Sequence, residues 1–132
     1  MRSDNHPGAI LVVDDDDCVR RVVKAFLEAA GYTVISATDG VAGLAFYQQN
    51  QPEIALLLTD VAMPNMNGLD LADRVLEIDG KLPVLFMSGT AGCADRGYGC
   101  MEKPFLGSEL IARVGAALQH EAGRGPLFTL WP

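Results

Sequence analysis

Short apolar runs alternate along this chain with longer segments in which apolar residues recur at helical spacing. Five runs are expected to form strands: Ile10–Val13, Tyr32–Ala37, Ile54–Thr59, Val84–Met87 and Gly99–Glu102. The segments expected to form helices are Cys18–Ala30, Gly40–Gln49, Leu69–Leu76 and Ser108–Glu121. Strands that alternate with helices predict an α/β domain with a parallel sheet and right-handed crossovers.

Capping residues mark the expected ends of these segments. Asp17 is predicted to cap the first helix, and Gly31 is predicted to end it. The turn residues 65–68 precede the third helix. No linker divides the chain, so we expect a flexible N-terminus over residues 1–8, one domain over 9–121 and a tail over 122–132. The apolar end of that tail, Leu127–Pro132, is expected to pack on its own domain or on a second copy.

Composition excludes several classes of function. The chain has 132 residues and a net charge of −7, which disfavours direct binding to nucleic acid. Its one basic cluster, Arg20, Arg21 and Lys24, is interpreted as the solvated face of a helix. No apolar run reaches the ~20 residues that a membrane span needs, and no secretory signal is found at the N-terminus. Three cysteines without paired spacing favour a reducing, cytoplasmic compartment.

Charged and polar residues follow four of the predicted strands directly. Asp14 and Asp15 follow the first, Asp60 the third, Ser88 the fourth and Lys103 the fifth. The carboxyl ends of parallel strands meet at one edge of the sheet, where α/β proteins bind ligands. Two carboxylates ~5 Å apart repel by roughly 3 kcal/mol at an effective dielectric of 20, so the cluster predicts a divalent cation and a lysine at the same site. Oxygen ligands suit Mg²⁺, or Mn²⁺ in its place.

Four sequence segments, in this order, make the chain resemble the receiver domain of bacterial two-component response regulators, over Ala9 to Glu121. They are Ile10–Asp15, Asp60–Pro64 with Asn67 and Gly68, Ser88–Gly89, and Lys103–Phe105. The resemblance implies a flavodoxin-like, doubly wound sheet of five parallel strands in the order 2-1-3-4-5, the order that a member of this family exemplifies.

The resemblance also assigns roles to individual residues. Asp60 is expected to accept the phosphoryl group, and Asp14, Asp15, Asp60 and the Ala62 backbone carbonyl to hold Mg²⁺. Ser88 is expected to hydrogen-bond the phosphoryl group, Lys103 to pair with its charge, and the Lys103–Pro104 bond to be cis. Positions matching Ala62 and Thr90 flank the path of the hydrolytic water. Because Ala62 is small, we expect a site fairly open to water and a phosphorylated state that is not exceptionally long-lived.

Two features depart from the family pattern. Only fourteen residues separate Ser88 from Lys103, and the segment between them is rich in glycine. The fourth helix of the family is therefore expected to be shortened to about one turn near Ala94–Arg96, or absent. Cys100 occupies the switch position where the family usually has an aromatic residue, which predicts an altered conformational relay.

The expected partners are a sensor histidine kinase or a phosphotransfer protein and an unidentified downstream protein. The resemblance implies Val19–Leu27 and Phe105–Ser108 as candidate contact surfaces for the kinase. A homodimer is possible, and membrane contact is not expected. No DNA-binding or catalytic module follows in the sequence, so output is expected through protein contacts. The chain is interpreted as a signalling receiver that catalyses only its own phosphorylation and dephosphorylation.

Two other interpretations stay open. A degenerate receiver would serve only as an interaction module. A haloacid-dehalogenase-type phosphatase would use the D-x-D-x-[TV] pattern of Asp15–Val19. This phosphatase class requires an acidic pair after its lysine, and no such pair follows Lys103. Substitution of Asp60 would separate this phosphatase from a receiver, because the nucleophile of the phosphatase lies in the first motif.

Overall fold

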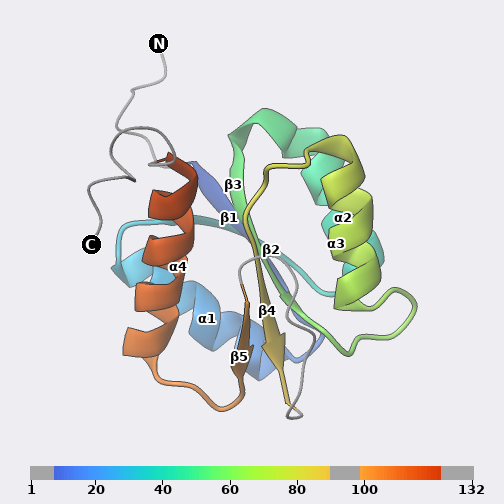
Figure 1. Cartoon of the computed structure of the whole chain (residues 1–132). Coiled ribbons are helices and arrows are strands. Elements are labelled where there is room, and N and C mark those ends of the chain that lie inside the picture. Colours follow the sequence, from blue (N-terminus) through green and yellow to red (C-terminus); the bar gives the residue numbers. More distant parts are fainter. Residues whose placement is uncertain (1–7, 90–98, 123–132) are drawn as a thin grey trace.

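The computed structural model describes residues 8–89 and 99–122, and these residues form a parallel sheet with helices on both faces (Figure 1). The strands are β1 (Ala9–Val13), β2 (Thr33–Ala37), β3 (Ile54–Asp60), β4 (Val84–Ser88) and β5 (Cys100–Glu102). The helices are α1 (Asp17–Ala29), α2 (Gly40–Asn50), α3 (Gly68–Ile78) and α4 (Gly107–Ala122), with a 3₁₀ turn η1 (Gln51–Glu53). The strand order is β2-β1-β3-β4-β5, and every pairing is parallel. The predicted fold class and strand order are confirmed.

The central strand β1 shows why the sheet is covered on both sides. Leu11 and Val13 are buried in the apolar cluster beneath α2 and α3, whereas Ile10 and Val12 are buried in the cluster beneath α1 and α4. All four side chains are 0% exposed. Burial of each one stabilises the fold by about 1.5–3 kcal/mol. A continuous apolar run, without polar alternation, is thus the sequence signature of a strand with two covered faces.

The start of α1 differs by one residue from the prediction. Asp16, not Asp17, is the N-cap, and its Oδ1 accepts hydrogen bonds from the backbone N–H groups of Cys18 at 2.9 Å and Val19 at 3.2 Å. Asp17 is the first residue of the helix itself. At the other end, Gly31 has a φ of 98°, as expected for the glycine that ends a helix.

The turn before α3 brings the chain back against the end of β3. Asn65 has a left-handed φ of 70°, and the Asn67 side chain caps α3 by accepting a hydrogen bond from the Asp70 N–H at 2.8 Å. A Cβ atom on Gly68 would collide with the backbone carbonyl of Asp60. Only glycine therefore lets α3 begin this close to Asp60.

Several predictions fall outside the described residues. They concern the N-terminus up to residue 7, Thr90, Cys93, the shortened helix near Ala94–Arg96 and the apolar segment Leu127–Pro132. The division into residues 1–8, 9–121 and 122–132 stays a prediction. Among the described helices, none has the length and apolar character needed to span a bilayer.

Candidate functional site

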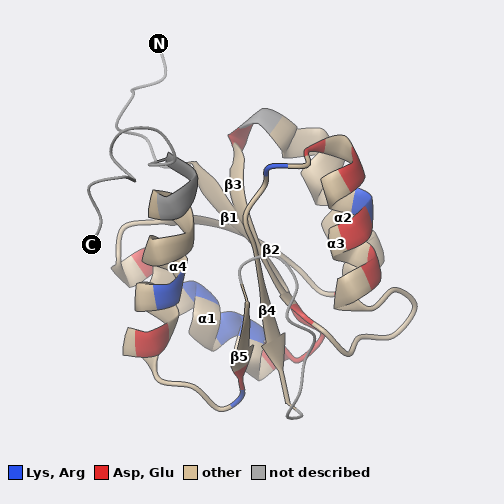
Figure 2. Ribbon diagram, viewed as in Figure 1, with Lys and Arg blue, Asp and Glu red and all other residues tan. Residues whose placement is uncertain are grey.

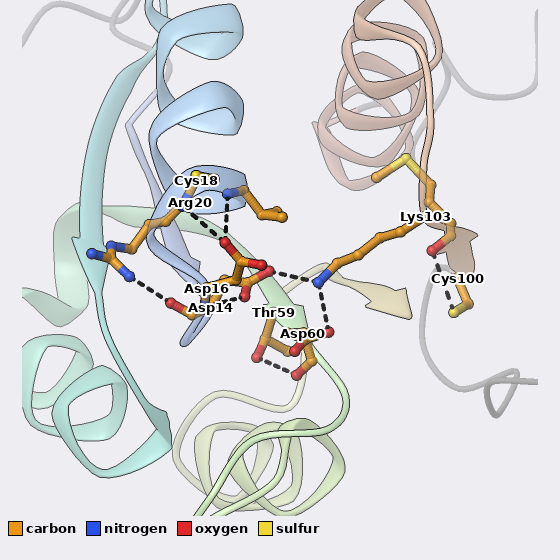
Figure 3. Close-up of polar contacts among 10 residues, drawn as sticks. Asp14, Asp16, Cys18, Arg20, Thr59, Asp60, Cys100 and Lys103 are labelled. Carbon is orange, nitrogen blue, oxygen red and sulfur yellow. Dashed lines mark hydrogen bonds and ion pairs between the residues drawn. The ribbon is translucent and has the colours of Figure 1, made fainter. Parts of the chain in front are cut away.

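Three charged side chains from three strands meet at the carboxyl edge of the sheet. Asp14 follows β1, Asp60 ends β3 and Lys103 follows β5, and all three point toward one another (Figure 3). Lys103 Nζ lies 2.9 Å from Asp14 Oδ2 and 3.1 Å from Asp60 Oδ1. Asp14 is 0% exposed and Asp60 5%. Buried carboxylates at this spacing are stable only with a cation between them, which is the role that Lys103 fills.

Backbone hydrogen bonds between neighbouring strands fix the positions of Asp60 and Lys103. The Val61 N–H, directly after Asp60, donates to the Met87 carbonyl at 2.9 Å, and the Lys103 N–H donates to the Ser88 carbonyl at 2.7 Å. The Lys103–Pro104 bond is cis, as predicted. Acidic residues after β1 and a basic residue after β5 consequently lie at the same end of the sheet (Figure 2).

A divalent cation fits the acidic side of this cluster. One carboxylate oxygen from each of Asp14, Asp15 and Asp60 lies within 4.8 Å of the others. Asp15 is exposed beside two buried partners, so the cluster opens to solvent. Ala62, the proposed carbonyl ligand, follows β3 at an exposed position. A set of oxygen donors open to water suits Mg²⁺, which keeps part of its hydration shell.

The charges at the site shift two ionisation equilibria. Burial and the neighbouring Asp14 carboxylate raise the pKa of Asp60, although Lys103 acts in the opposite direction. Burial alone would lower the pKa of Lys103, but its hydrogen bonds and ion pairs with Asp14 and Asp60 raise it. Lys103 is therefore held in its charged form, while Asp60 carries its charge at an energetic cost.

The loop after β1 is anchored through every polar group of Asp14. Its N–H donates to the Ala37 carbonyl at 3.2 Å, and its Oδ1 accepts from the Asp16 N–H at 2.8 Å. Its Oδ2 accepts from Lys103, and its carbonyl accepts from Arg20 Nη1 at 2.8 Å. Two hydrogen bonds to the backbone of Asp14 and two to its carboxylate oxygens thus fix the direction of this side chain.

Arg20 is the site residue that the sequence did not reveal. Its side chain is only 15% exposed, so interpreting it as part of a solvated helix face was wrong. Its second amino group, Nη2, lies 2.5 Å from Asp17 Oδ1, and this contact lowers the pKa of Asp17. The spacing of three residues could have suggested the pair with Asp17. The bond to Asp14, in contrast, depends on the turn between β1 and α1.

The two predicted switch positions lie on the neighbouring strands. Ser88 is buried at the end of β4, one residue beyond the pairing of Met87 with Asp60. Cys100 is half-buried on β5 opposite Phe86 and belongs to a disulfide bond, whereas Cys18 is a free thiol. The prediction of unpaired cysteines is therefore wrong for Cys100, whose spacing in the sequence did not indicate a disulfide.

An apolar groove opens beside the acidic cluster. Its volume is about 520 Å³, and it runs between the first turns of α1 and the segment that follows β5. The lining residues are Cys18, Val19, Val22, Val23, Gly89, Lys103, Pro104 and Phe105. Three large apolar side chains of α1 and of the segment after β5 are exposed, Val22 at 52%, Phe26 at 44% and Leu106 at 72%. We call these three residues, with the groove, the α1 docking face.

Comparison with known proteins agrees with this geometry. The model of the response regulator receiver domain family matches residues 10–115. The transcriptional regulatory protein CseB of Streptomyces avermitilis is 35% identical over 118 residues, which are 84% of this chain and 49% of that protein. TrcR of Mycobacterium tuberculosis, also a transcriptional regulatory protein, is 32% identical over 92% of this chain and 49% of its own length. The chain thus spans about half the length of these relatives.

Solved structures show the same likeness. The receiver domain of the hybrid histidine kinase CckA superposes with a TM-score of 0.77 at 38% identity, covering 85% of this chain and all of that domain. The chemotaxis protein CheY4 of Vibrio cholerae gives 0.77 at 26% identity, over 83% of this chain and 98% of its own. The chain belongs to the response regulator receiver domain family of two-component signalling systems.

Proposed function

We propose that Asp60 is the phosphoacceptor of this receiver and that Asp14, Asp15 and the Ala62 carbonyl complete a Mg²⁺ site around it. The observation that carries the proposal is the contact of Lys103 with both Asp14 and Asp60, in a cluster whose third carboxylate, Asp15, faces solvent. A buried carboxylate that a lysine holds at the rim of an open acidic cluster is suited to meet an anionic phosphoryl group.

The reaction transfers one phosphoryl group to the Asp60 carboxylate. A carboxylate oxygen forms a bond to phosphorus in line with the leaving group. The bond from phosphorus to the histidine nitrogen of the donor breaks, and this nitrogen keeps the electron pair. Acetyl phosphate reacts in the same way, with acetate as the leaving group. Water later attacks the phosphorus of the acyl phosphate, which releases inorganic phosphate and restores the carboxylate.

Each site residue has a separate task in this transfer. Lys103, kept protonated by its two carboxylate partners, faces the developing charge on the phosphoryl oxygens. The Ser88 hydroxyl, at the neighbouring strand end, is assigned the hydrogen bond to the transferred group. A bound Mg²⁺ supplies neutralisation of charge on the phosphoryl oxygens. The chain catalyses only the gain and loss of its own phosphoryl group.

We further propose that a histidine kinase or phosphotransfer protein delivers the group by docking on the α1 docking face. Val22 and Phe26 are apolar and exposed there, and Lys103 lines the adjoining groove. A partner seated on this face would place its phosphohistidine next to the acidic cluster. The downstream partner is a separate protein or a further module of a longer chain.

The test is the intact mass of the protein after incubation with acetyl phosphate, with and without Mg²⁺. We expect the gain of one phosphoryl group with Mg²⁺ and none when Mg²⁺ is chelated. Asp60→Asn should abolish the gain, whereas the exposed control Glu77→Gln on α3 should retain it. Labelling that persists in Asp60→Asn would contradict the assignment of the acceptor. No labelling from acetyl phosphate or from any purified kinase would favour a pure interaction module.

A further inference from the structure

We propose that Arg20 is a positioning residue of the metal site. By holding the main chain between β1 and α1, its guanidinium keeps the carboxylates of Asp14 and Asp15 directed toward Asp60. This inference rests on the proposed function, because it assigns a role toward the cation that the acidic cluster would bind. It concerns a residue of α1 that touches neither the phosphoryl group nor the cation.

The geometry of Arg20 is that of a clamp across a loop. Nη1 donates to the Asp14 carbonyl oxygen at 2.8 Å (Figure 3). Nη2 donates to Asp17 Oδ1 at 2.5 Å. One rigid, planar group thereby joins the end of β1 to the first turn of α1. The Arg20 side chain is 15% exposed, compared with 70% for Asp17, so the inner half of the clamp is shielded from water.

The acceptors of Arg20 matter as much as its position. It contacts the backbone carbonyl of Asp14 and leaves both oxygens of that carboxylate to the Asp16 N–H and Lys103. The guanidinium charge therefore offsets the run of four aspartates without occupying an oxygen of the acidic cluster. A lysine ammonium is a compact charge without the planar, two-pronged geometry by which the guanidinium spans these two acceptors.

Asp15 depends on this clamp most directly. Its side chain is exposed, and no other described residue holds its carboxylate. Its direction is thus set by the main chain on its two sides, which is fixed by Asp14 on one and by the Asp16 cap on the other. Loss of the bond from Arg20 to the Asp14 carbonyl would free this segment to rotate. The cation would then have to order its own ligands.

The sign of the charge effect makes the proposal testable. Arg20→Met and Arg21→Met each remove one positive charge from the first turns of α1, and Arg21 is an exposed neighbour. Because each arginine repels Mg²⁺, loss of its charge alone would make Mg²⁺ bind more tightly to both variants. We expect Arg20→Met to bind Mg²⁺ about 10-fold more weakly than wild type, a typical effect for groups that hold metal ligands in place. Arg21→Met should bind Mg²⁺ as tightly as wild type or more tightly.

The measurement is the Mg²⁺ dissociation constant by calorimetric titration of the full chain, with thermal unfolding without metal as a second readout. The Mg²⁺ dissociation constant of Arg20→Lys should lie between those of wild type and Arg20→Met. If the methionine variant does not fold, Arg20→Lys replaces it in the comparison. Equal affinities in Arg20→Met and Arg21→Met would overturn the proposal. So would a lower melting temperature with an unchanged Mg²⁺ affinity, which would mark a merely structural role. A wild-type chain that binds no Mg²⁺ would overturn the proposed function as well.

Discussion

At the scale of single residues, the site depends on a carboxylate that carries charge in an unfavourable place. Asp60 is 5% exposed and lies beside a second buried carboxylate, Asp14, and both share the single ammonium group of Lys103. The net effect of these surroundings is to raise the pKa of Asp60, which means that they favour its neutral form. The role proposed for Asp60 is therefore linked to reduced stability of the metal-free protein.

Replacing this carboxylate with a neutral amide should stabilise the metal-free protein. We expect Asp60→Asn to raise the free energy of unfolding at neutral pH by about 1 kcal/mol, the usual size of a single-residue effect, because the amide places no charge beside the buried Asp14 carboxylate. The raised folded pKa means that the folded state binds the proton more tightly than the unfolded state. The gain should thus be present above the folded pKa and should vanish as pH falls below the ordinary value of 3.8.

Urea unfolding with metal chelated, at neutral pH and at successively lower pH, measures this gain. The exposed Glu77→Gln should change the free energy of unfolding by less than about 0.5 kcal/mol. A wild-type protein at least as stable as Asp60→Asn at neutral pH would show that Lys103 fully compensates the buried charge.

The residues of the acidic cluster were predictable, and the residue that braces it was not. Asp14, Asp60 and Lys103 could be grouped from the sequence because parallel strands bring their carboxyl ends to one edge. Arg20 escaped this reasoning because helical periodicity places it on a polar face, where solvent is the default neighbour. Its bond to the Asp14 carbonyl exists only because the turn between β1 and α1 folds back within its reach.

At the scale of secondary structure elements, the main misplacement is the start of α1. All four residues of the run Asp14–Asp17 are good N-caps, so the sequence alone cannot choose among them. The folded chain makes the choice: the Asp14 N–H is tied to β2 through the Ala37 carbonyl, and the Asp14 carboxylate accepts from the Asp16 N–H. The Asp16 side chain is then the one that caps α1. The end of α1 was predicted correctly, because Gly31 is the single residue there that marks a helix end.

Removing the cap tests this assignment. Asp16→Ala loses two hydrogen bonds to the first turn of α1 and should lower the free energy of unfolding by about 1 kcal/mol. Asp16→Ser should recover most of that loss, because serine also accepts hydrogen bonds from a helix N-terminus. Thermal or urea unfolding of both variants measures the difference. Equal stabilities of the alanine and serine variants would argue against Asp16 as the cap.

At the scale of the whole molecule, the two faces of the sheet present different surfaces. The side covered by α1 and α4 carries the α1 docking face next to the acidic cluster, whereas α2 and α3 cover the opposite side (Figure 1). Strand order and helix placement followed from the alternating pattern and the family resemblance. The groove did not, since its shape depends on how α1 packs beside the segment after β5.

A matched pair of surface variants tests which side receives the kinase. Val22 on α1 is 52% exposed and Val41 on α2 is 55% exposed, so aspartate is tolerated equally at both. We expect Val22→Asp to slow phosphotransfer from a histidine kinase at least 10-fold, because it buries a charge in an apolar contact. Val41→Asp should leave this rate unchanged, and both variants should accept the phosphoryl group from acetyl phosphate at the wild-type rate.

The kinase for this assay is the one that phosphorylates the wild-type chain fastest in a panel of purified, autophosphorylated histidine kinases. Equal slowing by Val22→Asp and Val41→Asp would place the docking surface elsewhere. Slower labelling of Val22→Asp by acetyl phosphate as well would show damage to the acidic cluster itself rather than to a protein contact.

The ion pair between Lys103 and Asp14 joins residues 89 positions apart in the chain. During synthesis, both buried carboxylates leave the ribosome well before the lysine that neutralises them, since β5 is the last strand of the sheet. An incomplete chain therefore lacks the ammonium group that the proposed transfer to Asp60 requires. The final strand therefore completes the charge balance of the proposed phosphoacceptor site.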